Sequence, residues 1–568
     1  MAGAHIPVSD GWCFQLQGVI YLPVRCSTYI MIRPEVVQQL ESPAFGLATS
    51  WILSRNCVPA DSLDEVQRFF QREFWPFPKT HPRKDEILAN ALRVKANGTY
   101  MNKSVEQEVV LRLYNESICH APDKAEELGI GYANRSAVYF NQKQYNHCLD
   151  NILLAKANNY PTSKMQKLLE REQKCLNMMQ ECSNERKQPV VTDNEQHNSN
   201  LEMASIPDYG RGFIATKDLK VGNLALIEKF SLLVLEHESA YSRCNHCGFG
   251  NNLDLIPCRT CCSAMYCSEQ CRANAYNQYH RFECGITEDL KCLFKGPKPT
   301  RVFHIALRLF WIAMGDLLKN AEAFCLEYKQ NLNDYRNPLN VDPSKLHFHI
   351  LSESTSRKNK DKTDKGITQF FTVLAYHIAV KENTAFPTGQ ILNEYESVLL
   401  EVLYRLFWIA ISICDQSIKG MTCLYPLLRL VNHTCAPNVE RCWINQQSVL
   451  VVKRPIKAGE QILLCYISNN TFESMTKDKR VSLLQKHFNF ICQCLACVLD
   501  YPQLNTVQDN QILRSELQTI DSVVNDEQKR RALEKYLERH DDHYPLKELS
   551  EAWQIYRKLR ADLKASCD

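Results

Sequence analysis

The chain has 568 residues, which is length for several domains rather than one. Its hydrophobic share of 45% and its charged share of 23% are typical of a soluble globular protein. The formal net charge of +3 builds in no bulk attraction to nucleic acid or to an anionic membrane.

Residues 1–12 lack the basic and apolar segments of a secretory signal, and no stretch approaches 18 consecutive apolar residues. The richest stretch, 398–414, is interrupted by Glu401 and Arg405, which predicts a buried amphipathic helix rather than a membrane span. We therefore expect an intracellular protein of the cytoplasm and nucleus, with no membrane association. Such a reducing compartment disfavours disulfides and leaves metal binding as the favoured use of clustered cysteines, of which the chain has 26 in all.

From about residue 89 to 182, apolar residues at three- and four-residue spacing predict helices. Within this region, residues 132–139, a short polar turn and residues 145–157 form a repeat-like segment. Small side chains such as Ser136 and Cys148 alternate with bulky ones, so two antiparallel helices can approach closely. The arrangement resembles a tetratricopeptide (TPR) unit, and an unrelated helical hairpin is the alternative.

Strand patterns lie on both sides of a long central segment. Residues 213–235 alternate strand-like runs with a turn at Gly222-Asn223. Strand character returns at 449–452 and at 461–466.

The remaining segments are predicted to form a linker, helices and a surface loop. Residues 183–200 are polar and without periodicity, which predicts a linker. A largely helical stretch from about 291 to 420 carries a charged, polar insertion at 352–366, which we expect to be a surface loop. From 510 onward the chain is predicted to be helical and highly charged.

The first cysteine cluster holds seven cysteines and one histidine in closely spaced pairs. The pairs are Cys244-x2-Cys247, Cys258-x2-Cys261, Cys267-x3-Cys271 and His280-x3-Cys284. Two sets of four such ligands are the number that two tetrahedral structural zinc sites require. A fragment of about 40 residues cannot bury enough apolar surface to fold alone, so the metal must contribute folding free energy. Cys262, next to Cys261, is an alternative ligand.

A histidine in seventh place and a cysteine in eighth, after Met265-Tyr266-Cys267, resembles a MYND finger. RING and PHD fingers also hold two zinc ions, but their histidine comes earlier in the ligand order. MYND fingers are chiefly protein-interaction modules, so the resemblance implies protein partners for this one. The alternative is that the finger only braces its neighbouring domains.

The second cluster, Cys492-x-Cys494-x2-Cys497, leaves a zinc ion one ligand short. Cys435 is an obvious fourth donor. It lies in a set of short motifs whose order and spacing resemble the core of a SET domain with its post-SET zinc. The motifs are Asn432-His433-Thr434-Cys435-Ala436-Pro437-Asn438, then Ala458-Gly459-Glu460-Gln461-Ile462, then Cys465-Tyr466, then the three cysteines.

A SET domain split by a MYND finger resembles the SET and MYND domain-containing (SMYD) family of protein-lysine methyltransferases, and the N-terminal helices favour its member-four type. The resemblance implies an α+β multidomain fold. In it, a β-rich SET domain is split by the finger and a helical insertion, and helices flank both sides. The expected segments are 1–88 of uncertain fold, 89–182 TPR-like helices, 183–202 linker, 203–243 SET N-terminal part, 244–284 MYND finger, 285–420 helical insertion, 421–470 SET core, 471–500 post-SET zinc region and 501–568 C-terminal helices.

The same resemblance implies S-adenosylmethionine as methyl donor, three zinc ions (two in the finger and one post-SET), and a protein substrate with an exposed lysine. Tyr466 would be catalytic, with its hydroxyl beside the transferring methyl group, and Phe490 would stack near the adenine. Asn432 and His433 would hold polar groups of the cosubstrate, partly through backbone atoms. The implied cosubstrate-binding residues are Gly210, Arg211, Gly212, Asn432, His433, Tyr466 and Phe490.

Two departures from the family pattern favour a second hypothesis. Phe488 stands where members commonly have a tyrosine, and the helix at 407–414 has no asparagine to contact the cosubstrate. The alternative is therefore a catalytically weak adaptor, for example in transcriptional repression, whose finger and TPR-like helices bind protein partners.

Other readings are disfavoured. Residues 210–215 also spell the Gly-x-Gly-x-x-Ala of dinucleotide-binding proteins, but we expect neither a strand at 203–209 nor a helix start at 216–222. Direct nucleic-acid binding is disfavoured, because the charge is balanced and no basic helix interleaves with aromatic residues. We expect a monomer.

Overall fold

A computed structural model describes the chain in segments, of which those before residue 84 are described by their backbone alone. The described segments are 5–8, 11–16, 19–24, 28–31, 84–102, 104–181, 200–250, 253–287, 299–353, 369, 372–373, 375–381, 393–413, 420–444, 447–467, 471–488 and 490–560. They form an α+β protein with two compact units. Unit 1 comprises Met1–Gln188, Leu232–Arg336 and Val341–Leu424, and unit 2 comprises Pro189–Ser231, Asn337–Asn340 and Tyr425–Asp568.

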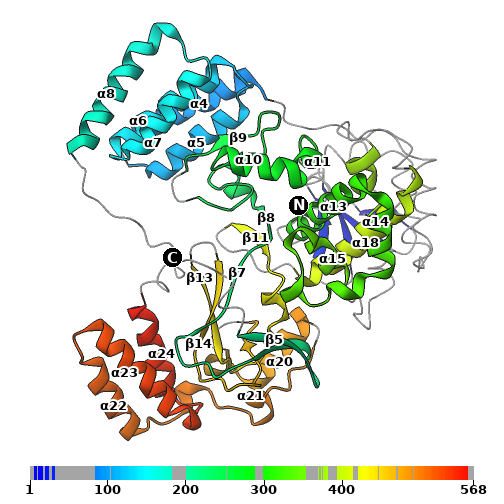
Figure 1. The fold of residues 1–568 in the computed structure, drawn as a ribbon, viewed down its shortest axis with the longest axis vertical. Coiled ribbons are helices and arrows are strands. Elements are labelled where there is room, and N and C mark those ends of the chain that lie inside the picture. The colour runs from blue at the N-terminus through cyan, green and yellow to red at the C-terminus, as the bar shows by residue number, and fades with distance from the viewer. Residues whose placement is uncertain are drawn as a thin grey trace. The chain divides into compact units, whose positions relative to one another are not determined.

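Unit 1 begins with an antiparallel sheet in the order β1-β2-β3-β4, followed by a series of helices (Figure 1). Side chains from successive helices share one apolar core, which includes Ile118, Tyr139 and Ile152. The elements are β1 His5–Val8, β2 Gly11–Leu16, β3 Val19–Val24, β4 Thr28–Met31, α4 Glu86–Met101, α5 Gln107–His120, α6 Glu126–Asn141, α7 Tyr145–Ala157 and α8 Met165–Glu181.

The cysteine-rich block of unit 1 packs against these helices and against a second helical group. Its core side chains, such as Tyr266 and Phe282, belong to the same apolar cluster as Trp311 of α13 and Leu403 of α18. The elements are β8 Leu232–Leu235, β9 Ile256–Pro257, β10 Met265–Tyr266, α10 Glu269–Ala275, a π-helical turn Tyr276–His280, α11 Arg281–Glu283, α13 Pro299–Lys319, α14 Ala321–Gln330, α15 Leu346–Leu351, α18 Glu396–Ile413 and β11 Met421–Leu424.

Arg135 of α6 is fully buried and joins the N-terminal helices to the loop before β9. Its Nη2 lies 2.9 Å from Oδ1 of Asp254, and its Nη1 donates to the carbonyl oxygen of Leu255 at 2.7 Å. Asn151 of α7 completes the network, because its Nδ2 donates to Asp254 at 2.8 Å. Burial alone would raise the pKa of Asp254, but His147 and Arg135 hold that pKa below its usual range. The finger is therefore anchored to the helices by a buried ion pair.

Replacing Arg135 with methionine is expected to lower the free energy of unfolding by about 3 kcal/mol, because Asp254 loses its arginine partner and keeps only part of its compensation, from His147 and Asn151. Thermal unfolding measures this effect. Arg112→Met is the matched control: it lies on the exposed face of α5 and should change stability by less than about 0.5 kcal/mol. Equal effects of the two substitutions would contradict the anchoring role.

Unit 2 is built on short sheets. The largest has the order β13-β14-β7, antiparallel throughout, and places Ser448 opposite Glu228. Beside it, β12 pairs in parallel with β15, and β5 pairs in antiparallel fashion with β6. The strands are β5 Leu201–Ile206, β6 Gly210–Ala215, β7 Leu224–Lys229, β12 Asn432–His433, β13 Val439–Ile444, β14 Gln447–Val452 and β15 Leu463–Leu464.

The C-terminal helices of unit 2 pack on this sheet. Trp553 and Tyr536 share an apolar core with Ile227 of β7, Ile444 of β13 and Val449 of β14. The helices of unit 2 are α19 Thr471–Ser474, α20 Lys477–Phe488, α21 Leu495–Val498, α22 Gln511–Asp521, α23 Asp526–Arg539 and α24 Lys547–Leu559, and a 3-10 turn, η9, covers Leu428–Leu430.

One expectation about secondary structure was wrong. No strand was expected at 203–209, but Leu201–Ile206 forms β5, so Gly210 opens the second strand of a hairpin rather than preceding the first strand. Glu202 and Ala204 of β5 have low strand propensity, and pairing with β6 overrides that preference. A dinucleotide-binding motif is still disfavoured, because the glycines lie in strand β6 and are not followed by a helix.

Several predictions lie wholly or mainly outside the described residues, namely the linker, the charged insertion and the end of the C-terminal region. Among the residues that the structure does describe, no helix combines the length and the apolar character needed to cross a bilayer.

Candidate metal centres and cosubstrate site

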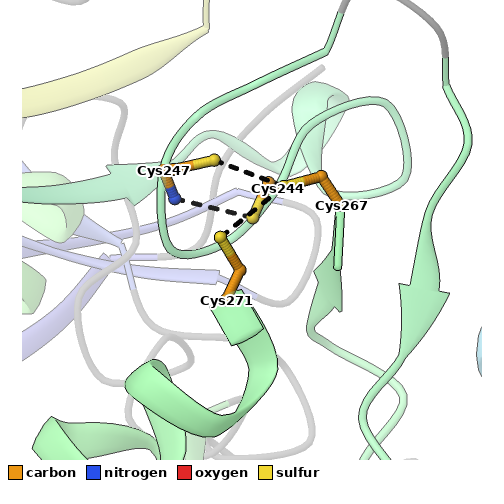
Figure 2. A group of neighbouring side chains, drawn as sticks. All are labelled: Cys244, Cys247, Cys267 and Cys271. Atoms are coloured by element: carbon orange, nitrogen blue, oxygen red, sulfur yellow. Dashed lines mark hydrogen bonds between the residues drawn. The ribbon is translucent and has the colours of Figure 1, made fainter. Parts of the chain in front are cut away.

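Four cysteine sulfurs of the finger converge on one point, as Figure 2 shows. Cys244 and Cys247 come from a loop after β8, Cys267 follows β10, and Cys271 lies in the first turn of α10. Ser268 caps α10 and accepts the backbone N–H of Cys271 at 3.1 Å, which fixes that turn. The Cys247–Cys267 and Cys267–Cys271 sulfur separations are 3.5 and 3.6 Å. A tetrahedral zinc with bonds of about 2.3 Å requires sulfurs about 3.8 Å apart, so the group fits zinc.

The second group consists of Cys258, Cys261, His280 and Cys284. The Cys258 and Cys284 sulfurs lie 3.8 Å apart, and Nε2 of His280 lies 3.2 Å from the Cys258 sulfur. The two groups therefore interleave along the chain, because the first and third ligand pairs make one and the second and fourth make the other. The adjacent Cys262 is buried but belongs to neither group.

The imidazole of His280 is oriented from behind by a buried ion pair. Its Nδ1 lies 3.2 Å from Oε1 of Glu283, and the Nη2 of Arg308 donates to the same oxygen at 2.8 Å. Burial alone would raise the pKa of Glu283, but Arg308 and His280 hold it well below its usual range. A carboxylate in this position fixes the tautomer of a zinc-binding histidine, with Nε2 aimed at the metal.

Replacing Glu283 with glutamine is expected to weaken zinc binding at the second finger site by about 10- to 100-fold and to leave the first site unchanged. Competition with a chromogenic chelator measures the two affinities. Glu269→Gln is the matched control, since that carboxylate is exposed and pairs with Arg272 on the surface of α10. Wild-type affinity in Glu283→Gln would contradict the orienting role.

The third group lies in unit 2 and joins Cys435 to Cys492, Cys494 and Cys497. The Cys435 sulfur lies 3.6 Å from that of Cys497 and 4.0 Å from that of Cys492, which again suits a tetrahedral zinc. The described residues contain a further close group, His147, Asp150 and Asp254, but Arg135 already neutralises Asp254 there.

Arg480 of α20 lies fully buried beside the third group. Its Nη2 donates to the carbonyl oxygen of Ala496 at 3.1 Å and approaches the sulfur of Cys497 at 3.9 Å. Four thiolates around one Zn²⁺ leave two negative charges, and a buried guanidinium compensates part of that charge.

The glycine motif and Asn432 lie in contact in unit 2. The Nδ2 of Asn432 donates to the carbonyl oxygen of Arg211 at 3.1 Å and to Oε1 of Gln461 at 2.7 Å. A side chain at Gly212 would place its Cβ 2.4 Å from that nitrogen, so only glycine permits the approach. Gly210 has φ +79°, and a Cβ there would meet nothing within 4 Å. The backbone at Gly210 therefore faces open space that a ligand can approach.

Tyr466 follows β15 and sits among aromatic rings. Its hydroxyl donates to the carbonyl oxygen of Val431 at 2.8 Å. Its ring centroid lies 5.1 Å from that of Phe488 and 6.4 Å, edge-on, from that of Phe490. Burial raises the pKa of Tyr466 to about 12, so the hydroxyl stays protonated at neutral pH.

Both ring nitrogens of His433 are already engaged within the protein. Nδ1 accepts the backbone N–H of Tyr466 at 3.0 Å, and Nε2 lies 3.5 Å from the sulfur of Cys435. Burial lowers the pKa of His433 to about 4, which agrees with a neutral ring. A cosubstrate contact from this residue would therefore use backbone atoms, while the side chain links Tyr466 to the third cysteine group.

The structure thus brings the predicted metal ligands into three groups of four and collects the predicted cosubstrate residues in unit 2. Sequence reasoning missed the residues behind them, above all Glu283, Arg308 and Arg480. Each is a single charged residue without a spacing pattern, and only burial beside a ligand reveals its role.

Comparisons with known proteins agree with this arrangement. A family model described as SET domain matches residues 210–467. The chain is 22% identical to the protein named protein-lysine N-methyltransferase SMYD4 of Danio rerio, over 74% of this chain and 66% of the relative. It is 22% identical to the Homo sapiens protein of the same name (73% and 67%) and 23% identical to histone-lysine N-methyltransferase SMYD3 of Mus musculus (52% and 61%). The chain spans about two thirds of the length of the SMYD4 proteins it matches.

Proposed function

Because the chain belongs to the SET and MYND domain-containing family and is of the SMYD4 type, we propose that it is a protein-lysine methyltransferase that uses S-adenosylmethionine. The substrate would be a lysine of a histone or of another protein. The finger and the N-terminal helices would bind protein partners.

One observation carries this proposal. The glycine strand at 210–212, the Asn432-His433 pair and Tyr466 are distant in sequence, yet hydrogen bonds tie them together in unit 2. Residues that are far apart in the sequence converge in this way where a ligand must be held in one geometry. The open backbone face at Gly210 gives such a ligand room to approach.

S-adenosylmethionine, when bound, supplies a methyl group on a positively charged sulfur. The lysine amine must be neutral, so that its lone pair can form the new C–N bond. The electron pair of the broken C–S bond would stay on sulfur. The protein contributes positioning and exclusion of water. Because the pKa of Tyr466 is about 12, its side chain would act at neutral pH as an oriented hydroxyl and not as a base. The methylated amine would lose its extra proton to solvent.

The adaptor hypothesis rests on two departures from the family pattern: no asparagine stands at 407–414, and the ring of Phe488 carries no hydroxyl beside Tyr466. Calorimetric titration of the zinc-loaded protein with S-adenosylmethionine separates the two functions. The enzyme should bind one equivalent, and absence of binding by folded protein would leave the adaptor. Where binding is seen, methylation of a peptide array with labelled cosubstrate should identify the substrate lysine.

A further inference from the structure

The position of the Tyr466 hydroxyl depends on the segment before Asn432. The hydroxyl donates to the carbonyl oxygen of Val431, and the backbone N–H of Tyr466 donates to His433. The orientation of the Val431 carbonyl therefore determines where the hydroxyl of Tyr466 points.

Val431 is held in turn by the 3-10 turn η9. Its backbone N–H donates to the carbonyl oxygen of Leu428 at 3.1 Å, and the N–H of Leu430 donates to that of Leu427 at 2.9 Å. A shift or loosening of this turn would move the Val431 carbonyl directly.

The start of the turn is capped from a distant strand. Glu228 of β7 accepts the backbone N–H of Leu427 on one carboxylate oxygen at 2.8 Å and that of Leu428 on the other at 2.7 Å. Helix starts leave such N–H groups without partners in the turn itself, and local side chains usually cap them. Here η9 has no side-chain cap of its own, and a residue about 200 positions earlier provides it.

A buried carboxylate is costly, so its presence calls for a reason. Glu228 is 6% exposed, and the charged groups that act on it are Arg429 of the turn and Arg441 of β13. Burial raises the pKa of Glu228 to about 7, against the opposing effect of the two backbone N–H groups and the two arginines. When Glu228 is protonated, one of its oxygens becomes a hydroxyl, which accepts a backbone N–H much more weakly than a carboxylate oxygen does.

We propose that Glu228 is a positioning residue for Tyr466, acting through η9 and the Val431 carbonyl. The proposal rests on the proposed methyltransferase function for its effect on rate, but not for its effect on structure. Since the ionised carboxylate accepts both N–H groups, positioning is nearly complete at about pH 8, half lost near pH 7 and mostly lost by about pH 6.

Glu228→Gln tests the proposal, because the amide keeps the size of the side chain but has only one acceptor oxygen. We expect kcat to fall at pH 8 by about 10-fold, with the wild-type to variant ratio shrinking towards 1 as the pH falls from 8 to 6. Deprotonation of the lysine substrate affects both proteins alike and cancels in the ratio. Hydrogen exchange should quicken in peptides that cover 427–433 and Tyr466.

Glu440→Gln is the matched control. Glu440 is a buried carboxylate of β13 in the same sheet, but it accepts Nε1–H of Trp553 and pairs with Arg557 of α24. Its loss should lower the melting temperature without changing the pH dependence of the ratio or the exchange at 427–433.

A flat ratio together with unchanged exchange in Glu228→Gln would overturn the proposal, even if the melting temperature fell. If the wild-type protein transfers no methyl group, the proposed function fails and hydrogen exchange alone decides the positioning role. If Glu228→Gln does not fold, Glu228→Asp replaces it. The shorter carboxylate should loosen the same peptides, and unchanged protection would reject the role.

Discussion

Replacing Tyr466 with phenylalanine is expected to lower the rate of methyl transfer by about 100-fold or more, while S-adenosylmethionine still binds with near wild-type affinity. The reason is that the substitution removes one oxygen beside Phe488 and Phe490 and leaves the surrounding rings in place. Single-turnover transfer to a peptide substrate measures the rate, and calorimetry measures binding. A fall in transfer without a loss of affinity would place the hydroxyl in the transition state rather than in the binding step.

The matched control is Tyr536→Phe. The hydroxyl of Tyr536 is also buried and also donates to a backbone carbonyl oxygen, that of Leu513 at 3.0 Å, but among the C-terminal helices. It should cost about 1 kcal/mol of stability and no activity. Unchanged transfer in Tyr466→Phe would reject the catalytic role of Tyr466.

Replacing Cys435 with serine is expected to weaken zinc binding at the third group by about 100-fold or more, so that the purified protein carries two zinc ions instead of three. The apolar cluster around this group is small, and four of its buried members are the ligands themselves, beside Leu484, Ala496 and Leu504. A zinc ion bound there would therefore supply much of the local stability. We expect residues 471–510 to become sensitive to protease and cosubstrate binding to weaken, because His433 links the sulfur of Cys435 to Tyr466.

Cys262→Ser is the control for this experiment. Cys262 is buried next to Cys261 but lies outside the three groups, so its variant should retain three zinc ions. Zinc analysis by atomic emission distinguishes the outcomes. Three ions in Cys435→Ser, or two in Cys262→Ser, would mean that the ligand assignment is wrong.

The metal ligands were predictable because two cysteines a few residues apart can chelate one ion, and this spacing is visible in the sequence. The division of the finger ligands into two sets was not, since paired spacings are compatible with either consecutive or interleaved sites. The structure resolves this through β10 and α10, which carry Cys267 and Cys271 back to Cys244.

The supporting residues were beyond sequence reasoning for a different reason. Glu228 follows four apolar residues of β7 and precedes Lys229, and a single carboxylate at such a place carries no pattern. Its partners, the N–H groups of Leu427 and Leu428, belong to the backbone and have no sequence signature at all. Likewise, β5 was missed because Glu202 and Ala204 have low strand propensity, and its pairing with β6 is not visible in the sequence.

Unit 2 is made of segments that are far apart in the sequence, and this affects how it folds during synthesis of the chain. Strand β7 leaves the ribosome about 220 residues before its partner β14, and the pairing of Ile227 with Val449 must wait for that partner. At about 5 to 20 residues per second, the wait lasts about 10 to 45 seconds. During that time Ala225, Leu226 and Ile227, all buried in the finished protein, stay uncovered on the nascent chain. The inserted part of unit 1 can fold in the meantime, so unit 2 is the last to close and depends longest on protection from aggregation.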